Sequence, residues 1–259
     1  MFHVEHSGNY NKLRKGRFEN VDRGVDMCIS DPRPDSPDVP RGTIQNPESL
    51  GRTLAERGVV LGSDSMEAIR AYHQLLEEWN QKMNLVSAGL LAAGIWEELY
   101  FDSLVPLAEP GLVPERARVA DIGSGAGIPG MLLALARPDL KVVLVDSIRK
   151  KALFLQAAVA QLAPDRVKVL HDRVEALYGR KSLAGSDLVT FKAFAAVAEC
   201  MEIGRRLVRP GGRILLYKGG DVAEELAAAR KKYPAFTYRT IPYRLPISGK
   251  ERNLMVVTI

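Results

Sequence analysis

Four glycines within eight residues form the most chemically suggestive part of the sequence. Residues 119–130 read VADIGSGAGIPG, so an apolar run passes into glycines and then into a second apolar run. Glycine adopts backbone conformations that other residues avoid, and it lets a ligand approach the main chain closely. The free N–H groups at the start of the following helix add hydrogen-bond donors. The stretch therefore predicts a ligand-binding loop between a strand and a helix.

The spacing of these glycines fits two different ligands. Gly125, Gly127 and Gly130 match G-x-G-x-x-G, the pattern of a dinucleotide-binding loop and thus of an NAD-dependent oxidoreductase. Counted from Gly123, with Asp121 before the turn, the same stretch reads D-x-G-x-G-x-G. That arrangement resembles the S-adenosylmethionine loop of class I methyltransferases, in which an acid near the strand end suits the cationic methionine moiety. A glycine turn that binds no ligand is the third interpretation.

An acidic residue after the next apolar run supports a nucleoside ligand. Asp146 ends the segment VVLVD, and an acid at the carboxyl end of a second strand can accept hydrogen bonds from both ribose hydroxyls. This role serves NAD and S-adenosylmethionine equally. Capping of the next helix, which begins near Arg149, is the structural alternative. The residues after the third apolar run, Val174 and Glu175, are expected near the adenine edge of the ligand.

Strand and helix patterns alternate around these candidate residues. Helices are expected over 127–137, 149–162, 196–207 and 222–232, and strands over 118–122, 141–145, 167–171, 187–191, 212–217, 236–241 and 253–258. No helical pattern separates the last two strands. The order predicts an α/β fold with a doubly wound, mostly parallel seven-stranded sheet, closed by an antiparallel terminal hairpin.

The first part of the chain has a different character. Residues 1–46 contain several prolines and lack apolar periodicity, so we expect a disordered tail. Residues 47–114 form an N-terminal helical extension, and residues 115–259 form the sheet domain. Apolar residues recur at helical spacing near 50–59 and 63–79, and a further helix is expected over 90–107.

Composition narrows the class of protein. Two distant cysteines and four histidines without a cluster argue against a disulfide scaffold and against a metal site. No apolar stretch approaches the length of a membrane span, and a cytoplasmic location is expected. The net charge is +5, and residues 1–46 contribute none of it. A cationic folded domain attracts polyanions, although a solvated basic surface explains the charge equally well.

Several motifs together resemble one family, the bacterial 16S ribosomal RNA guanine-N7 methyltransferases, over residues 48–259. The shared segments, in chain order, are WNQKMNL at 79–85, DSL at 102–104, the loop at 121–130, VDS at 145–147 with Lys150 and Lys151, RVE at 173–175, KAFA at 192–195, KG at 218–219 and ERNL at 251–254. The resemblance implies a Rossmann-like methyltransferase fold. It also implies methyl transfer from S-adenosylmethionine to N7 of one guanine of 16S rRNA, of the position-527 type.

The resemblance also implies site residues and partners. The cofactor-binding residues are Gly123, Gly125, Gly127, Ile128, Val174, Glu175 and Lys192, with Asp146 on the ribose. Small-subunit rRNA, in the subunit or an assembly intermediate, is the expected partner of a monomeric protein. Candidate RNA contacts are Lys82, Lys150, Lys151, Lys192 and Lys218. A non-catalytic RNA-binding protein on the same fold is a further alternative.

Two positions depart from the family pattern, and no catalytic base is expected. Leu99 stands where the family usually has histidine, and Lys192 stands where it usually has arginine. Lysine keeps the charge but loses the planar fork of arginine. Guanine N7 carries a lone pair and no proton, so methylation requires positioning and electrostatics rather than a general base.

Overall fold

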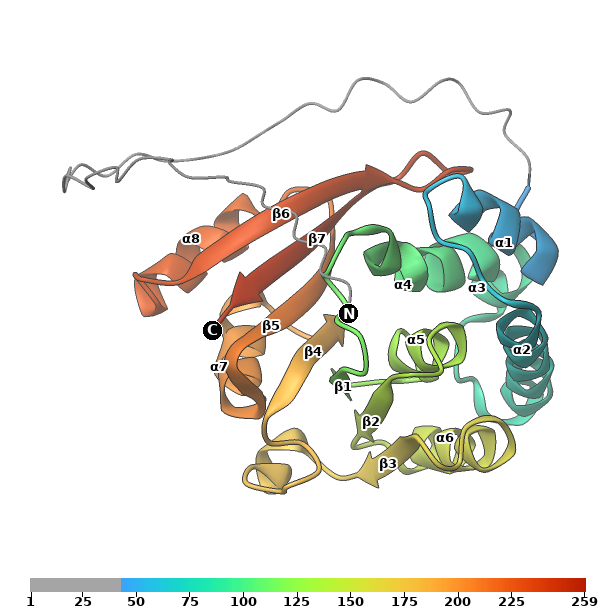
Figure 1. The fold of residues 1–259 in the computed structure, drawn as a ribbon, viewed down its shortest axis with the longest axis horizontal. Coiled ribbons are helices and arrows are strands. Elements are labelled where there is room, and N and C mark those ends of the chain that lie inside the picture. The colour runs from blue at the N-terminus through green and yellow to red at the C-terminus, as the bar shows by residue number, and fades with distance from the viewer. Residues whose placement is uncertain (1–42) are drawn as a thin grey trace, which may run out of the picture. The chain divides into compact units, whose positions relative to one another are not determined.

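A seven-stranded sheet organises the part of the chain that the structure describes, residues 43–259 of a computed structural model (Figure 1). The strand order is β3-β2-β1-β4-β5-β7-β6. Only β7 runs antiparallel to its neighbours, β5 and β6. The predicted doubly wound sheet with a terminal hairpin is confirmed. The strands are β1 Arg118–Ile122, β2 Lys141–Asp146, β3 Val167–His171, β4 Ser186–Lys192, β5 Val208–Gly219, β6 Thr237–Arg244 and β7 Glu251–Thr258.

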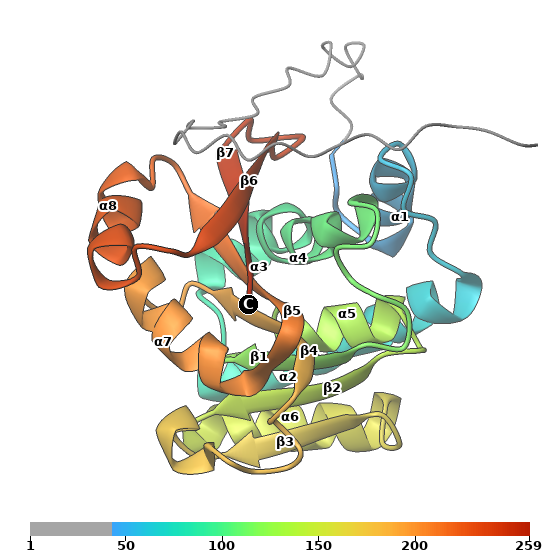
Figure 2. The same ribbon diagram turned by 60° about the vertical axis from the view of Figure 1, so that its left-hand side comes forward.

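Helices cover both faces of this sheet, as parallel strands require. On one face lie α5 and α6, and on the other lie α7 and α8 (Figures 1 and 2). Neighbouring residues of β1 alternate between the two cores, with Val119 in one and Ala120 in the other. The helices are α5 Gly130–Ala136, α6 Arg149–Leu162, α7 Val197–Leu207 and α8 Ala223–Lys232, and a short 3-10 turn, η3 Val174–Leu177, follows β3.

The helical extension packs on the face that also carries α5 and α6. Its apolar residues, among them Leu50, Ile69 and Leu76, belong to the same core as Phe154 of α6. The extension is thus continuous with the sheet domain rather than separately folded. Its segments are α1 Pro47–Ala55, α2 Ser63–Met83, α3 Ala88–Ala93, the π-helical η1 Ile95–Phe101, α4 Asp102–Leu104 and the 3-10 segment η2 Val105–Ala108.

The prediction of a single helix over residues 90–107 is wrong. Gly94 ends α3 with φ −134° and ψ −5°, and the chain then continues as a wider π-helix through Phe101. Pro106 lacks a backbone N–H, so the last turn tightens into the 3-10 segment η2. The helix expected from residue 127 begins only at Gly130, because residues 127–129 complete the glycine loop.

Most of the tail predicted for residues 1–46 lies outside the described residues. The last four residues of that prediction, 43–46, are described. Ile44 is buried in the core, and the side chain of Asn46 accepts a hydrogen bond from Ser49 N, which caps α1. Within residues 43–259, no helix is long and apolar enough to cross a membrane. The same residues contain no cluster of His, Cys, Asp or Glu that suits a metal ion.

Close packing of α7 on β5 yields a prediction about stability. A Cβ at Gly204 would lie 2.7 Å from Ile214 Cδ1 and 2.9 Å from its Cγ1. Alanine gains about 1 kcal/mol in helix propensity over glycine, whereas overpacking costs about 1–3 kcal/mol. We expect Gly204→Ala to lower the free energy of unfolding by about 1 kcal/mol in urea titrations. Gly89→Ala in α3, where no atom lies within 4 Å of the added Cβ, is the control and should be neutral or stabilising. Equal gains for both variants would contradict the packing argument.

Candidate functional site

The glycine loop is held against the end of β2 by backbone hydrogen bonds. The N–H groups of Gly123 and Ser124 both donate to Val145 O, at 2.9 and 3.0 Å. Ser124 Oγ donates to Asp121 O and accepts from Val145 N. Gly123, Gly125 and Gly127 have φ values of 71°, 60° and 85°. Residues with a side chain rarely adopt this left-handed backbone conformation, so the loop requires glycine at these three positions.

Asp146 closes the loop from the neighbouring strand. One of its carboxylate oxygens accepts from Gly125 N and the other from Ile148 N, both at 2.8 Å. The first contact orients the loop, and the second satisfies a free N–H group at the start of α6. A carboxylate has about four acceptor positions, so two remain for a ligand. The two roles weighed for Asp146, ribose acceptor and helix cap, are therefore compatible.

Asp121 has a different role from the one expected of it. Its side chain is 1% exposed, and its two oxygens accept from Gly130 N at 3.0 Å and from Thr190 Oγ at 2.8 Å. Burial raises the pKa of this carboxyl to about 6, although the hydrogen bonds from Thr190, Gly130 and Ser124 act to lower it. The carboxyl therefore joins β1 to β4 and to the start of α5, rather than facing a cationic ligand.

A tyrosine of the extension also fixes the loop. Tyr72 of α2 is fully buried, and its hydroxyl donates to Ala126 O in the glycine loop. Burial raises the pKa of this hydroxyl well above its usual range, so it remains a donor at physiological pH. Its ring packs against the rings of Tyr100 and Phe154. Tyr72 lies within the helical pattern expected near 63–79, but no sequence signal connected it with the loop.

The other expected cofactor residues lie along the same edge of the sheet. Ile128 is buried within the loop. Asp146 pairs in register with His171, and Val174 follows three residues later, buried at the start of η3. Glu175 beside it is exposed. Because the carboxyl ends of β1, β2 and β3 meet here, the loop, Asp146 and Val174 border one region.

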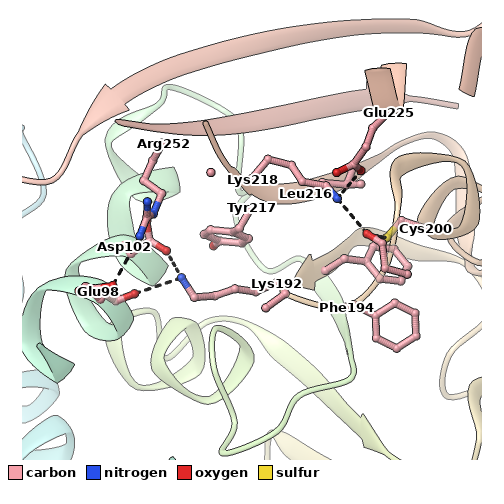
Figure 3. A pocket seen from close by; sticks show the side chains of 14 residues that line it. Glu98, Asp102, Lys192, Phe194, Cys200, Leu216, Tyr217, Lys218, Glu225 and Arg252 are labelled. Carbon is pink, nitrogen blue, oxygen red and sulfur yellow. Dashed lines mark hydrogen bonds and ion pairs between the residues drawn. The ribbon is translucent and has the colours of Figure 1, made fainter. Parts of the chain in front are cut away.

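A cleft of about 540 Å³ opens where β4 and β5 end against the extension (Figure 3). Lys192, at the end of β4, points into it and forms an ion pair with Asp102 of α4. Lys192 Nζ also lies 3.4 Å from Glu98 O. Burial and the nearby charge of Arg252 lower the pKa of Lys192, while Glu98 acts to raise it. The remaining lining includes Phe194, Tyr217, Lys218, Glu225 and Arg252.

Asp102 is the centre of the polar side chains in this cleft. Besides Lys192, its carboxylate accepts from the Tyr243 hydroxyl of β6 and lies 3.9 Å from Arg252 Nε of β7. Its side chain is only 3% exposed. The DSL segment singled out Asp102 as a family residue, but no sequence pattern connected it with Lys192 or Tyr243. Leu99, on η1, packs against the core and does not line the cleft.

Three of the five lysines expected to contact RNA bind other groups of the protein. Lys192 pairs with Asp102, Lys218 pairs with Glu225 at 2.7 Å, and Lys150 donates to Met83 O at 2.8 Å. Lys82 is exposed at the end of α2, and Lys151 Nζ lies 3.9 Å from the position of a Cβ on Gly125. Lys192 and Lys218 thus pair with carboxylates of the cleft, whereas Lys150 stays exposed and joins α6 to the end of α2.

Comparison with known proteins identifies the family. The family model described as rRNA small subunit methyltransferase G matches residues 65–255. The chain belongs to this family. Proteins named ribosomal RNA small subunit methyltransferase G are 34% identical over 218 residues in Limosilactobacillus reuteri and 35% identical over 219 residues in Lacticaseibacillus paracasei. These alignments cover 82% of this chain and 90% and 89% of the relatives. The expected family and its rRNA methylation activity are confirmed.

Solved structures agree on the fold. The O-methyltransferase TomG from Streptomyces achromogenes, solved with SAM, has a TM-score of 0.52 at 18% identity, covering 83% of this chain and 99% of its own. An O-methyltransferase from Bacillus cereus, solved with SAH, has a TM-score of 0.53 at 15% identity, covering 82% and 100%. These neighbours confirm the Rossmann-like fold, and the family match confirms a methyltransferase, for which S-adenosylmethionine is the expected cofactor. The oxidoreductase interpretation is set aside.

The contact between Tyr72 and the loop predicts a selective loss of cofactor affinity. Tyr72→Phe removes one hydrogen bond, worth about 0.5–1.5 kcal/mol, so we expect the Kd for S-adenosylmethionine to rise about fivefold. Calorimetric titration measures the Kd, and amide exchange of loop residues 123–128 should quicken in the cofactor-free protein. Tyr100→Phe is the matched control, because its equally buried hydroxyl contacts His73 and not the loop. Similar Kd values for both variants would contradict the assignment.

The raised pKa of Asp121 predicts a pH dependence of stability. A folded-state pKa of about 6 lies above the ordinary value of 3.8, so the fold favours the protonated form. The associated stability is complete below pH 3.8 and is lost as the pH rises through 6. Relative to Asp121→Asn, the wild-type free energy of unfolding should fall by about 3 kcal/mol over this window. Urea titrations across that range measure the difference, and parallel curves for the two proteins would refute the prediction.

Proposed function

We propose that this protein binds S-adenosylmethionine at the glycine loop and methylates N7 of one guanine of 16S rRNA in the adjoining cleft. The observation that carries the proposal is the shared position of Phe194. Its ring lies against Gly123 of the loop and also lines the cleft. A ligand on the loop and a base in the cleft would therefore meet at this ring.

The loop fits the cofactor in its backbone and its polar groups. At Gly125 an added Cβ would meet only Gly123 O and Lys151 Nζ, both at 3.9 Å, so the loop is open on this side. Gly123, Gly127 and Ile128 shape the loop that receives the cofactor, and Asp146 accepts from the ribose hydroxyls. Val174 and Glu175 border the adenine. When bound, the cofactor supplies an electrophilic methyl group on a sulfonium centre.

The chemistry of guanine N7 suits the side chains of the cleft. N7 needs no deprotonation, and among the described residues the cleft lining contains no histidine. The protein must therefore place the base and balance its charge, which becomes positive on methylation. Asp102 and Glu98 supply carboxylates for this purpose, while Lys192 and Arg252 keep them paired in the free protein. We assign Lys192 to the base side of the site, where it touches the cleft and orients Asp102.

The partner and location follow from the substrate. The RNA is 16S rRNA within the small subunit or an assembly intermediate, which implies a cytoplasmic location and a monomer at work on a larger particle. N7 faces the deep, narrow groove of an A-form helix, so the guanine must be exposed by the folded RNA. We therefore expect a preference for assembled particles over a duplex.

Mapping of the methylated base tests the proposal. Small subunits from cells that lack this modification are incubated with the protein and S-adenosylmethionine, and N7-methylguanine is located by chemical cleavage of the 16S rRNA. We expect one modified guanine. Methyl transfer to another atom, or to the large-subunit RNA, would refute the proposed reaction.

Asp146→Ala provides the cofactor-side control for that assay. Each lost hydrogen bond to a charged acceptor costs about 1.5–3 kcal/mol, so we expect the Kd for S-adenosylmethionine to rise at least tenfold. Asp146→Asn keeps one acceptor oxygen, so its Kd for S-adenosylmethionine should lie between that of the wild type and that of Asp146→Ala. Because the sheet does not depend on this side chain, circular dichroism should be unchanged. An unaltered Kd would remove Asp146 from the site.

Variants of Lys192 test whether this residue acts on the target guanine or on the cofactor. Lys192→Ala leaves the buried Asp102 with Tyr243 and Arg252 alone, so single-turnover methylation should slow by about 10- to 100-fold, the equivalent of one charged hydrogen bond. Lys192→Arg preserves the charge and should recover most of the rate. The Kd for S-adenosylmethionine should stay unchanged in both variants. A weakened Kd with an unaltered rate would instead place Lys192 at the cofactor.

A further inference from the structure

The positive charge of the described chain is concentrated in one segment. Residues 43–259 contain 29 Lys and Arg against 24 Asp and Glu, and residues 197–244 contain ten against five. The excess on this segment equals the excess on residues 43–259 as a whole. The rest of the described chain is therefore neutral overall, and the net positive charge comes from the segment that holds α7, β5, α8 and β6.

Half of these ten cations lie in the last turns of two neighbouring helices. We call this surface the α7–α8 patch, and it comprises the last-turn residues Arg205, Arg206, Arg230, Lys231 and Lys232. All five are exposed. Glu202 pairs with Arg206 at 2.9 Å and with Lys232 at 3.2 Å, and it reaches Arg205 at 4.0 Å. One carboxylate is shared by three cations, so the patch keeps a clear positive excess.

Aromatic rings alternate with these cations. Arg206 lies over Tyr178 at 5.1 Å, Arg205 over Tyr233 at 5.7 Å and Arg230 over Tyr238 at 5.6 Å. The rings of Tyr178, Tyr233 and Tyr238 are half-buried. Cations that contact phosphates and rings on which bases stack are the two components of surfaces that bind RNA strands.

The patch lies on the same two helices that carry part of the cleft lining. Cys200 of α7 and Glu225 of α8 line the cleft near the start of each helix. The patch residues follow five to seven positions later, about 8–10 Å along each axis at 1.5 Å per residue. Figures 1 and 2 show α7 and α8 side by side on one face of the sheet. A polymer that leaves the cleft along this face reaches the patch.

We propose that the α7–α8 patch binds the rRNA backbone beside the methylated nucleotide, as a second RNA contact outside the cleft. The identity of the RNA rests on the proposed function. The patch supplies what the cleft lacks, since Lys192 and Lys218 of the cleft are paired with carboxylates of the protein. Cations at helix C-termini also stabilise helices through the macrodipole. That role alone would affect stability and leave RNA affinity unchanged, so the two explanations give different results.

Charge removal at two sites tests the proposal. One variant carries Arg205→Gln, Arg230→Gln and Lys231→Gln, and its matched control carries Lys141→Gln, Lys168→Gln and Lys181→Gln, which are exposed lysines elsewhere. The Kd for unmethylated small subunits is measured across a potassium chloride series. We expect the patch variant to bind about tenfold more weakly. The slope of log K against log salt concentration should decrease in magnitude by about 2, because each of the three lost phosphate contacts contributes roughly 0.7. The control should change less than threefold, and cofactor Kd should stay constant in both.

Each other outcome overturns a distinct claim. Equal weakening of both triple variants would show general attraction and no patch. A lower melting temperature of the patch variant with unchanged affinity would assign its cations to helix stability. If the wild-type protein binds small subunits but leaves guanine N7 unmethylated, the proposed function fails, while the affinity comparison still decides whether the patch binds RNA.

Discussion

Asp102 places a nearly inaccessible carboxylate between the helical extension and the sheet. A buried charge is tolerated only when paired and hydrogen-bonded, so its partners are constrained as strictly as the charge itself. Those partners come from β4, β6 and β7 through Lys192, Tyr243 and Arg252. One ionised group therefore fixes how four separate segments meet, and the cleft takes its shape from that meeting.

The helical extension is consequently part of the reaction site, and more than a cover for one face of the sheet. Tyr72 holds the glycine loop from α2, while Asp102 holds the cleft from α4. Between them, Glu97 on the π-helical η1 accepts from the backbone of Ser248 at 2.9 Å, which ties down the turn between β6 and β7. π-Helical turns are frequent at functional sites, since they redirect side chains without ending the helix.

The sequence predicted most of the sheet and part of the site. The structure matches, residue for residue, the expected strands 118–122 and 167–171 and the expected helix 149–162. These elements were predictable because apolar runs and glycine breaks are local signals. The glycine loop and Asp146 were recognisable for the same reason. The contacts of Tyr72 and Asp102 were not, since Ala126 lies 54 residues from Tyr72, and Lys192 and Tyr243 lie 90 and 141 residues from Asp102. The broken helix over 90–107 was missed because helical periodicity does not distinguish a π-helical turn from an α-helical one.

The position of β7 has a consequence for the order in which the enzyme is completed. This strand lies between β5 and β6, although it follows both in the chain. As a nascent chain emerges, β6 has no neighbour to pair with until residues 251–258 are available. Arg252 joins the cleft in the same step. Until β7 has paired, the cleft stays open along the side that Arg252 lines, so one segment completes the sheet and the site together.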